Sequence, residues 1–428
     1  MSLLRKAILV NGAEFICLAL SVVQAAILAR ALGPAGVGQY DLVRSVLVLT
    51  PQLCCLGFPL SFLYHSRRNT ENTKKYLMNT IWLMLLLSMA GGAGLVFLVV
   101  SKAEYFGFIP WFAMIGIGLY VPTLLGNVIA RNILLIEIEA RKLSLMRILS
   151  VGSGVVITLT LWSTGILRVP QALLCFVFTA FVGMAVGWTW TRDYIDLSIK
   201  PSLCISRKLA FMGIRLSWAD LMVLFNAQVN ILIIKYLLED FQSVGYFSRA
   251  QRIAALVVLS GRAIMPMLFS RWASLPQDRL TAHLEKVLRF GTSVSMIIFL
   301  AILVFGKWLI LIVYGKEFLP ALQSLRILVP GAAVYLLSKT LMFLLSSRGV
   351  PELSALVLFV GTISNIALSF LLIPQMGISG AAWASTGGSI VLLLLLTLIV
   401  RKKYDIKVMH CLYLNKSDIK SLWKSLLS

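Results

Sequence analysis

The chain has 428 residues, of which 59% are hydrophobic and only 13% charged, and its mean hydropathy is +0.91. A soluble domain carries about 25% charged residues, so the composition excludes an ordinary soluble protein and indicates an integral membrane protein. The 39 Lys and Arg residues outnumber 17 Asp and Glu, giving a net charge of +22. Most of this charge lies in short loops between apolar stretches, so we attribute it to membrane topology and not to nucleic-acid binding.

Twelve apolar stretches are long enough to cross a bilayer, which takes about 20 residues. In chain order they are Lys6–Ala31, Gly38–Tyr64, Tyr76–Val100, Phe108–Ile136, Ser144–Gly165, Pro170–Trp190, Leu209–Leu238, Ser243–Ser270, Leu284–Tyr314, Phe318–Ser346, Val350–Pro374 and Ser379–Val400. We therefore predict an all-α, polytopic membrane protein with about twelve transmembrane helices.

The loop charges predict the orientation of the chain. Lys and Arg favour one set of alternating loops over the other by roughly four to one, which places both termini in the cytoplasm. The tail 401–428 is basic and contains Trp423, so it either lies on the inner leaflet or is solvated.

An internal repeat relates the two halves of the chain. Val37-Gly38 reappears as Val244-Gly245 and Pro59 as Pro266, each at an offset of 207 residues. We predict two parallel six-helix repeats with a central site between them. The predicted domains are an N-terminal half over 1–192, a cytoplasmic linker over 193–208, a C-terminal half over 209–400 and the tail over 401–428.

Four arginines lie inside predicted spans: Arg44, Arg249, Arg252 and Arg326. The helical rise places them roughly 9–13 Å below the outer ends of their helices. An arginine at the bilayer centre costs about 2.5–3.5 kcal/mol, so such residues normally face a bundle interior or a wet cavity. A guanidinium there is suited to phosphate or carboxylate. The alternative is that these side chains extend to the outer headgroups.

Other polar residues lie in the first and seventh spans. The first contains Asn11, Glu14 and Gln24, and the seventh contains Asp220, Asn226 and Asn230. We predict that these two helices form facing walls of a wet cavity, and that Asn226 and Asn230 contact sugars. Glu14 and Asp220 could bind a proton or sodium ion, or could pair with an arginine. Arg131, Arg215, Arg262 and Lys339 lie near cytoplasmic helix ends, which is typical of interfacial anchors.

No catalytic or metal site is readable from the sequence. The six cysteines form no CxxC pair and the three histidines are widely separated. The predicted outer loops are short and carry no nucleophile–base pattern, which argues against an integral-membrane enzyme such as a sugar polymerase. We expect no cofactor and no metal.

Three stretches resemble one transporter family in order along the chain: ILARALGPAGVGQYDLVRSV, VGYFSRAQRI and YGKEFLPALQSLRILVPG. They are similar to the polysaccharide-exporter branch of the multidrug/oligosaccharidyl-lipid/polysaccharide transporter superfamily. The resemblance implies a V-shaped, MATE-like bundle and the function of an O-antigen-type flippase. Such flippases move an undecaprenyl-pyrophosphate-linked sugar unit from the cytoplasmic to the periplasmic leaflet of the bacterial inner membrane by alternating access. A proton or sodium gradient is the expected energy source, and phospholipids and other polysaccharide assembly proteins are expected partners.

A comparison with the related lipid II flippases narrows the substrate. In that family, cavity arginines on helices 1, 2 and 8 hold pyrophosphate, and Arg44, Arg252 and Arg249 correspond to the last two of these helices. The first helix here has no interior arginine, and two further C-terminal helices are missing, so the resemblance argues against lipid II. The competing function is a multidrug extruder of the same superfamily, but organic cations require an acidic cavity and this interior is basic.

Overall fold

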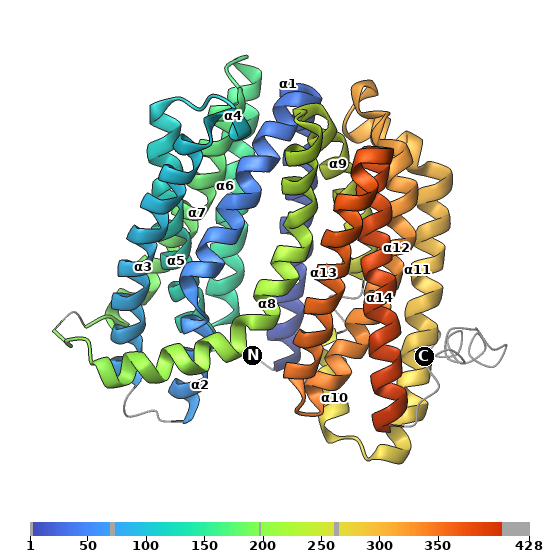
Figure 1. Ribbon diagram of the computed structural model, residues 1–428. Coiled ribbons are helices and arrows are strands. Elements are labelled where there is room, and N and C mark those ends of the chain that lie inside the picture. The colour runs from blue at the N-terminus through green and yellow to red at the C-terminus, as the bar shows by residue number, and fades with distance from the viewer. Residues whose placement is uncertain (1–2, 69–72, 138, 197, 261–264, 405–428) are drawn as a thin grey trace. The chain divides into compact units, whose positions relative to one another are not determined.

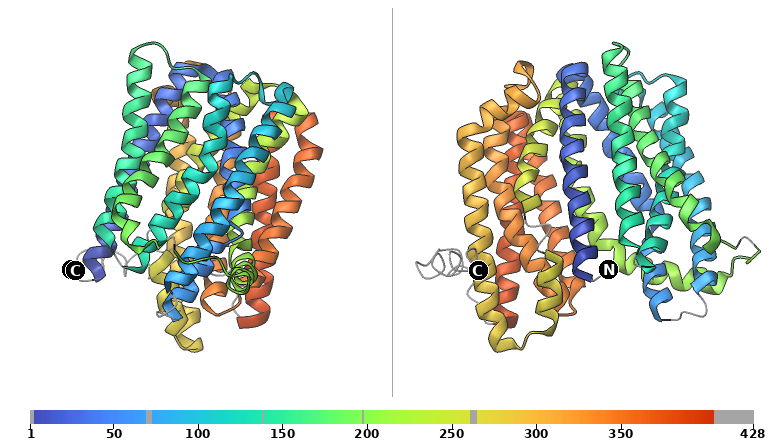
Figure 2. Two further views of the ribbon diagram at one scale, coloured as in Figure 1. Left: turned by 90° about the vertical axis from the view of Figure 1, so that its left-hand side faces the viewer. Right: turned by 180° about the vertical axis from the view of Figure 1, so that it is seen from behind.

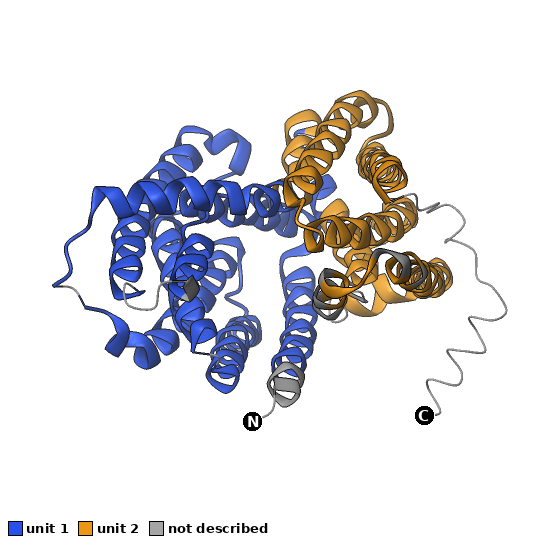
Figure 3. Ribbon diagram, turned by 90° about the horizontal axis from the view of Figure 1, so that it is seen from below, with its two compact units in different colours: residues 1–224, 239–245 blue, residues 225–238, 246–428 orange. Residues whose placement is uncertain are grey.

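The computed structural model describes residues 3–68, 73–137, 139–196, 198–260 and 265–404. These residues form α-helices with short 3-10 turns and contain no strand, which confirms the all-α prediction (Figure 1). The basic tail lies outside the described residues, apart from its first four residues, which end the last helix. The helices divide into two compact units, of which unit 1 is 1–224 with 239–245 and unit 2 is 225–238 with 246–428 (Figure 3).

The first two predicted spans lie within one helical run, α1 (Leu3–Cys55). Its backbone leaves the helical conformation at Gly33, where φ is 64°, and Pro34 follows at once. Figure 1 shows the chain turning there and running back toward α2 (Phe58–Arg68). Glycine adopts a positive φ without steric cost, and proline suits the first turn of a new helix.

Unit 1 also contains α3 (Thr73–Ser101), α4 (Ala103–Phe106), α5 (Trp111–Ile136), α6 (Ala140–Ser163) and α7 (Val169–Thr191). The long helices α3, α5, α6 and α7 run side by side in both views of Figure 2. α1 packs on α6, and α5 packs on both α3 and α7. The short 3-10 helix η2 (Arg192–Tyr194) follows directly after α7.

Glycines bring two segments of unit 1 into backbone contact. A Cβ on Gly38 would overlap the carbonyl oxygen of Phe241 and come 2.9 Å from the nitrogen of Gly245. Gly245 in turn faces the carbonyl oxygen of Pro34. Gly38 and Gly245 are equivalent positions of the 207-residue repeat, so the repeated Val-Gly pair marks the place where these segments meet.

Helix α8 (Leu203–Leu238) begins earlier than the predicted span, which started at Leu209. Its first part lies across the ends of the unit 1 helices in Figure 1 before the chain turns. The Asn79 side-chain oxygen accepts a hydrogen bond from the Ser202 backbone (2.7 Å), and Gly57 approaches the backbone of Gly213. Part of the predicted linker is therefore helical and packed on unit 1.

Unit 2 contains α9 (Phe241–Ser260) from Tyr246 on, α10 (Met265–Ser274), α11 (Gln277–Val313), the 3-10 turn η3 (Lys316–Phe318), α12 (Ala321–Ser347), α13 (Pro351–Met376) and α14 (Ile378–Tyr404). α14 packs on α12 and α13, and α11 packs on α12. The predicted eighth span, Ser243–Ser270, is divided between α9 and α10, and residues 261–264 between them lie outside the described residues.

The helix lengths agree with a polytopic membrane protein. Ten helices among the described residues are long and apolar enough to cross a membrane, and the first of these, Leu9–Cys55, is 47 residues long. That run contains two spans, one on each side of Gly33. α9 is 20 residues long, which at 1.5 Å per residue is about the 30 Å of a hydrocarbon core. With α1 counted twice and α9 included, the described residues contain a helix of about span length for each of the twelve predicted spans.

Candidate functional site

Arg44 lies on the second half of α1 and is half-buried in unit 1. Its guanidinium is 5.0 Å from the ring centroid of Phe176 on α7, and Phe176 stacks on Tyr120 of α5 with centroids 5.1 Å apart. A cation over an aromatic face gains about 0.5–2 kcal/mol, more when it is desolvated. The aromatic pair therefore supports the charge inside the membrane span and leaves its hydrogen-bond donors available to an anion.

Glu14 is bound to an arginine of the same unit. Its carboxylate accepts a charged hydrogen bond from Arg147 on α6, and the two side chains are 31% and 43% exposed. Ten residues further along α1, Gln24 donates to the Thr158 hydroxyl of α6 at 3.1 Å. Two of the polar residues predicted to line a wet wall on the first helix thus tie α1 to α6.

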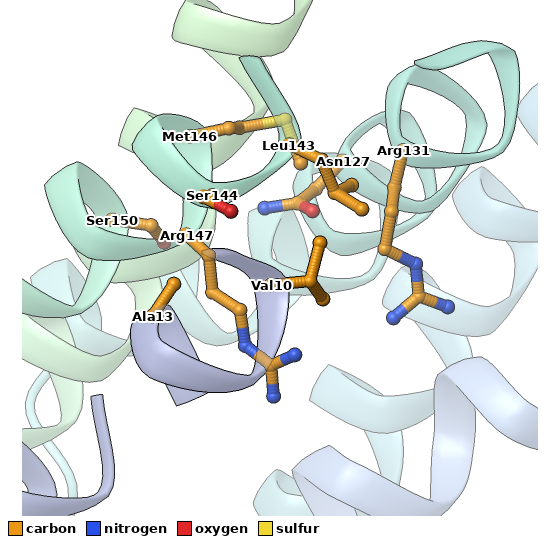
Figure 4. Close-up of a pocket in the computed structure, with 9 residues that line it drawn as sticks. All are labelled: Val10, Ala13, Asn127, Arg131, Leu143, Ser144, Met146, Arg147 and Ser150. Atoms are coloured by element: carbon orange, nitrogen blue, oxygen red, sulfur yellow. The ribbon is translucent and has the colours of Figure 1, made fainter. Parts of the chain in front are cut away.

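A cavity of about 170 Å³ lies beside this ion pair in unit 1. Figure 4 shows the guanidinium groups of Arg131 and Arg147 extending toward the same side of the cavity, with Val10 between them. Asn127 supplies an amide to the lining, which in full consists of Val10, Ala13, Asn127, Arg131, Leu143, Ser144, Met146, Arg147 and Ser150. The hydroxyls of Ser144 and Ser150 donate to the backbone carbonyls of Leu9 and Thr179, and Arg147 is bound to Glu14. Arg131 and the Asn127 amide are the polar lining groups that make no hydrogen bond with another described residue.

Asp220 lies on the part of α8 that belongs to unit 1, and its side chain is exposed. It makes no hydrogen bond or ion pair with another described residue. The structure therefore leaves this carboxylate accessible, whereas it gives Glu14 an arginine partner. A role for either residue in ion coupling stays a prediction.

The other three predicted arginines belong to unit 2 and differ in burial. Arg249 on α9 is fully buried, with its guanidinium 5.6 Å from the ring centroid of Tyr314. Arg252, one turn further along, is half-buried, and Arg326 on α12 is exposed. From the observed helix starts, the helical rise places Arg326 about 8 Å and Arg252 about 16 Å along their helices, a wider spread than the predicted depths. Their convergence on one cavity stays a prediction.

Asn226 and Asn230 form a polar ladder between α8 and α13. The Asn365 amide donates to the Asn226 oxygen, and the Ser369 hydroxyl donates to the Asn230 oxygen, each at 3.1 Å. Asn230 is fully buried. Such bonds join helices within a membrane, and the burial of Asn230 keeps it from contacting a sugar in this conformation. The predicted sugar contact of these two residues stays a prediction.

The sequence analysis missed several polar residues that the structure makes prominent. It treated Arg131 as an interfacial anchor, because that residue lies near a helix end, and it gave Arg147 no role. It also gave no role to Lys235, which is buried within α8, or to Asp41, which is buried on α1. A helical wheel of the fifth span would have put Arg147 in line with Ser144 and Ser150. Among the described residues, no group of three His, Cys, Asp or Glu side chains could hold a metal ion.

Solved structures with the same fold are transporters. A multidrug-resistance MATE transporter of the MOP superfamily, in its inward-facing conformation, matches with a TM-score of 0.76 at 16% identity, covering 93% of this chain and 98% of that one. The lipid II flippase MurJ, in an inward closed conformation, matches with a TM-score of 0.73 at 16% identity, covering 92% and 87%. At these identities the likeness establishes the fold.

Sequence comparisons carry the assignment further. The chain is 27% identical over 217 residues to the probable low-salt glycan biosynthesis flippase Agl15 of Haloferax volcanii, covering 49% of this chain and 45% of Agl15. It is also 27% identical over 128 residues to an uncharacterized membrane protein of Methanocaldococcus jannaschii, covering 30% and 25%. The chain thus matches less than half the length of these curated relatives. The family model for polysaccharide biosynthesis proteins matches residues 3–271, which is more than half of the chain. By this match, the chain belongs to the polysaccharide biosynthesis protein family.

Proposed function

We propose that this protein is a flippase that moves a lipid-linked oligosaccharide across the cytoplasmic membrane by alternating access. The substrate is an undecaprenyl-pyrophosphate-linked repeat unit of a surface polysaccharide, O-antigen being the type, and the membrane is a bacterial inner membrane with both termini on its cytoplasmic side. The protein acts as a transporter and not as an enzyme. Phospholipids surround it, and proteins that assemble the polysaccharide are its further partners.

The observation that carries this proposal is the placement of Arg44. A half-buried guanidinium inside a span, supported by two aromatic rings, is a costly arrangement unless it meets an anion. Pyrophosphate offers that anion, and the planar fork of arginine matches its oxygens. The likeness to a probable glycan flippase supports the same substrate class.

A multidrug extruder is the second candidate, because MATE transporters share the fold. The charges of the chain favour the flippase. Extruded organic cations need acidic partners, whereas the cavity of unit 1 is lined by Arg131 and Arg147 and, among the described residues, by no carboxylate. Uptake of a cationic dye into inverted vesicles tests this candidate, and robust gradient-driven uptake would favour it over the flippase.

The flippase is tested by surface-polysaccharide export in a strain that depends on this gene. Arg44→Ala and Arg252→Ala should abolish export at wild-type protein levels, because losing a charged contact to a buried anion costs about 2–5 kcal/mol of binding. Arg44→Lys should restore export only in part, since an ammonium cannot replace the fork. Arg30→Ala, at an exposed position on the first half of α1, serves as the control. Normal export by both alanine variants would contradict the proposal.

We further propose that a proton or sodium gradient drives transport, with Glu14 and Asp220 as the candidate coupling carboxylates. The Arg147 partner of Glu14 makes Asp220 the stronger of the two. Asp220→Asn should abolish gradient-driven flipping in proteoliposomes and leave substrate binding unchanged. If Asp220→Asn and Glu14→Gln both flip substrate normally under an imposed gradient, neither residue couples transport to an ion.

A further inference from the structure

The cavity between α1, α5 and α6 of unit 1 combines features that call for a small anion. Two guanidinium groups extend toward one side of it, and Arg131 lies close enough to Arg147 and Glu14 for their charges to act on it. Arg131 makes no hydrogen bond or ion pair with any other described residue, although a guanidinium carries five donors. Glu14 is bound to Arg147, and no carboxylate of the described residues lies within ion-pair distance of Arg131.

The size of the cavity selects the kind of anion. Its volume of about 170 Å³ is close to that of an engineered cavity of about 150 Å³ that holds benzene. Pockets for whole drug-sized ligands run to about 300–1,000 Å³, so a headgroup fits here and an oligosaccharide does not. The Asn127 amide adds a neutral donor, and its nitrogen occupies the space that a Cβ on Gly183 would take. A diphosphate, with one phosphate for each arginine, matches these donors.

The depth of the cavity places it on the route of the substrate. Arg131 lies about 8 Å before the end of α5, and Arg147 lies about 11 Å after the start of α6. Residues 137–139 connect these two helix ends next to Arg141 and Lys142, which the charge distribution assigns to the cytoplasm. The cavity is thus on the cytoplasmic side, from which the lipid-linked substrate arrives. Arg44, by contrast, lies in the outer half of the membrane by the predicted topology.

We propose that Arg131 and Arg147 form a diphosphate site on the cytoplasmic side of unit 1, and that Glu14 occupies Arg147 until the diphosphate displaces it. This inference rests on the proposed flippase function and adds a first binding step to it. Glu14 acts as an internal competitor, because its carboxylate holds the donors that the substrate requires. Displacement of Glu14 also releases the ion pair that ties the first half of α1 to α6, whereas Arg44 lies on the second half, beyond the break at Gly33.

The test measures binding of farnesyl diphosphate to the full-length protein in nanodiscs. Arg131→Ala and Arg147→Ala should each weaken binding by about 30-fold or more, because each removes a charged contact to the probe. Glu14→Gln should tighten binding by about tenfold, since Arg147 no longer has to leave a carboxylate. Arg141→Ala, which removes an exposed arginine from the same helix, is the matched control and should bind as the wild type does.

The result for Glu14→Gln separates a binding site from a structural ion pair. If the pair only holds α1 on α6, Glu14→Gln weakens binding or lowers the melting temperature, and the proposal is overturned. Arg131→Lys and Arg147→Lys, which keep the charge and avoid a folding defect, should recover part of the affinity. Unchanged affinity in both alanine variants rejects the site.

Two further arms identify the ligand and keep this inference apart from the proposed function. Phosphatidylglycerol in excess should compete poorly with farnesyl diphosphate, and equal competition would assign the cavity to bulk lipid headgroups instead. Export is measured in parallel. If the wild type exports polysaccharide but the Arg131 and Arg147 variants bind farnesyl diphosphate as tightly as the wild type, the proposed site is wrong. The proposed flippase function is then unaffected. Absence of polysaccharide export by the wild type would instead overturn the flippase.

Discussion

The two units use charged and polar residues in opposite ways. In unit 1, Arg44, Arg131 and Arg147 are half-buried or exposed, and their contacts are an aromatic ring or a single carboxylate. In unit 2, Arg249 and Asn230 are fully buried, and an asparagine–serine ladder joins α8 to α13. Unit 1 therefore keeps donors that a ligand can reach, whereas unit 2 builds the same residue types into its packing.

This difference teaches that an arginine in a membrane span is not one kind of feature. The cost of placing the charge there is offset either by a ligand and water or by permanent partners in the protein. Burial distinguishes the two cases better than depth along the helix. By that measure Arg44 is the better candidate for substrate contact, and Arg249 is the better candidate for holding unit 2 together.

The comparison predicts its largest effect for Arg249→Ala. Removing a fully buried guanidinium leaves a cavity and unanswered polar groups around it, so we expect a loss of about 3–5 kcal/mol and little folded protein. Arg147→Ala, which breaks a half-exposed pair, should cost less than about 1 kcal/mol. Thermal unfolding in detergent with fluorescence-detected gel filtration measures both. Similar melting temperatures for the two variants would remove the distinction between the units.

A second prediction concerns the close backbone contact at Gly38, which stabilises unit 1. Gly38 permits the backbone of α1 to approach Phe241 and Gly245, and a methyl group there meets main-chain atoms that cannot rotate away. Gly38→Ala should therefore destabilise the protein by about 3 kcal/mol, at the upper end of overpacking costs.

Gly94→Ala is the matched control, because a Cβ at Gly94 on α3 meets nothing within 4 Å. That variant should unfold at or slightly above the wild-type temperature, since alanine favours the helix by about 1 kcal/mol. A Gly38→Ala protein that is as stable as Gly94→Ala would show that the backbone contact is dispensable.

Much of the fold could be predicted because hydropathy acts locally. A run of about 20 apolar residues is stable in a bilayer only as a helix, and each predicted span corresponds to a helix among the described residues. The break in α1 could also be located, because the predicted spans Lys6–Ala31 and Gly38–Tyr64 leave Gly33-Pro34 between them. The first part of α8, which lies across the ends of the unit 1 helices, was not predictable. The polar segment before Leu209 is compatible both with a loop and with an amphipathic interfacial helix.

The site was less predictable, because partners are set by packing. Arg44 and Arg249 look alike in sequence, each several residues inside a span, yet one rests half-exposed on Phe176 and the other is enclosed beside Tyr314. The pairing of Glu14 with Arg147 joins residues far apart in the chain, and no local pattern encodes which arginine a carboxylate meets. Asn226 and Asn230 show the same limit, since one-turn spacing fits a cavity wall and a helix contact equally.

The smallest expected effect concerns the ladder between α8 and α13, and it measures how far polar bonds stabilise unit 2. Hydrogen bonds between membrane helices contribute about 0.6 kcal/mol on average and at most about 1.7. Ser369→Ala removes the donor to Asn230, whose oxygen is then left unanswered, so we expect a loss near the upper value. Asn226→Ala and Asn365→Ala remove the two sides of a single bond, and a double-mutant cycle on this pair should give a coupling of about 0.6 kcal/mol.

Polysaccharide export should be unaffected by Ser369→Ala once protein levels are matched, because the ladder joins helices and touches no substrate. Loss of export at wild-type stability would instead mean that this ladder opens during transport and lines the path of the sugar, and the contrast between an accessible unit 1 and a closed unit 2 would then hold for one conformation alone.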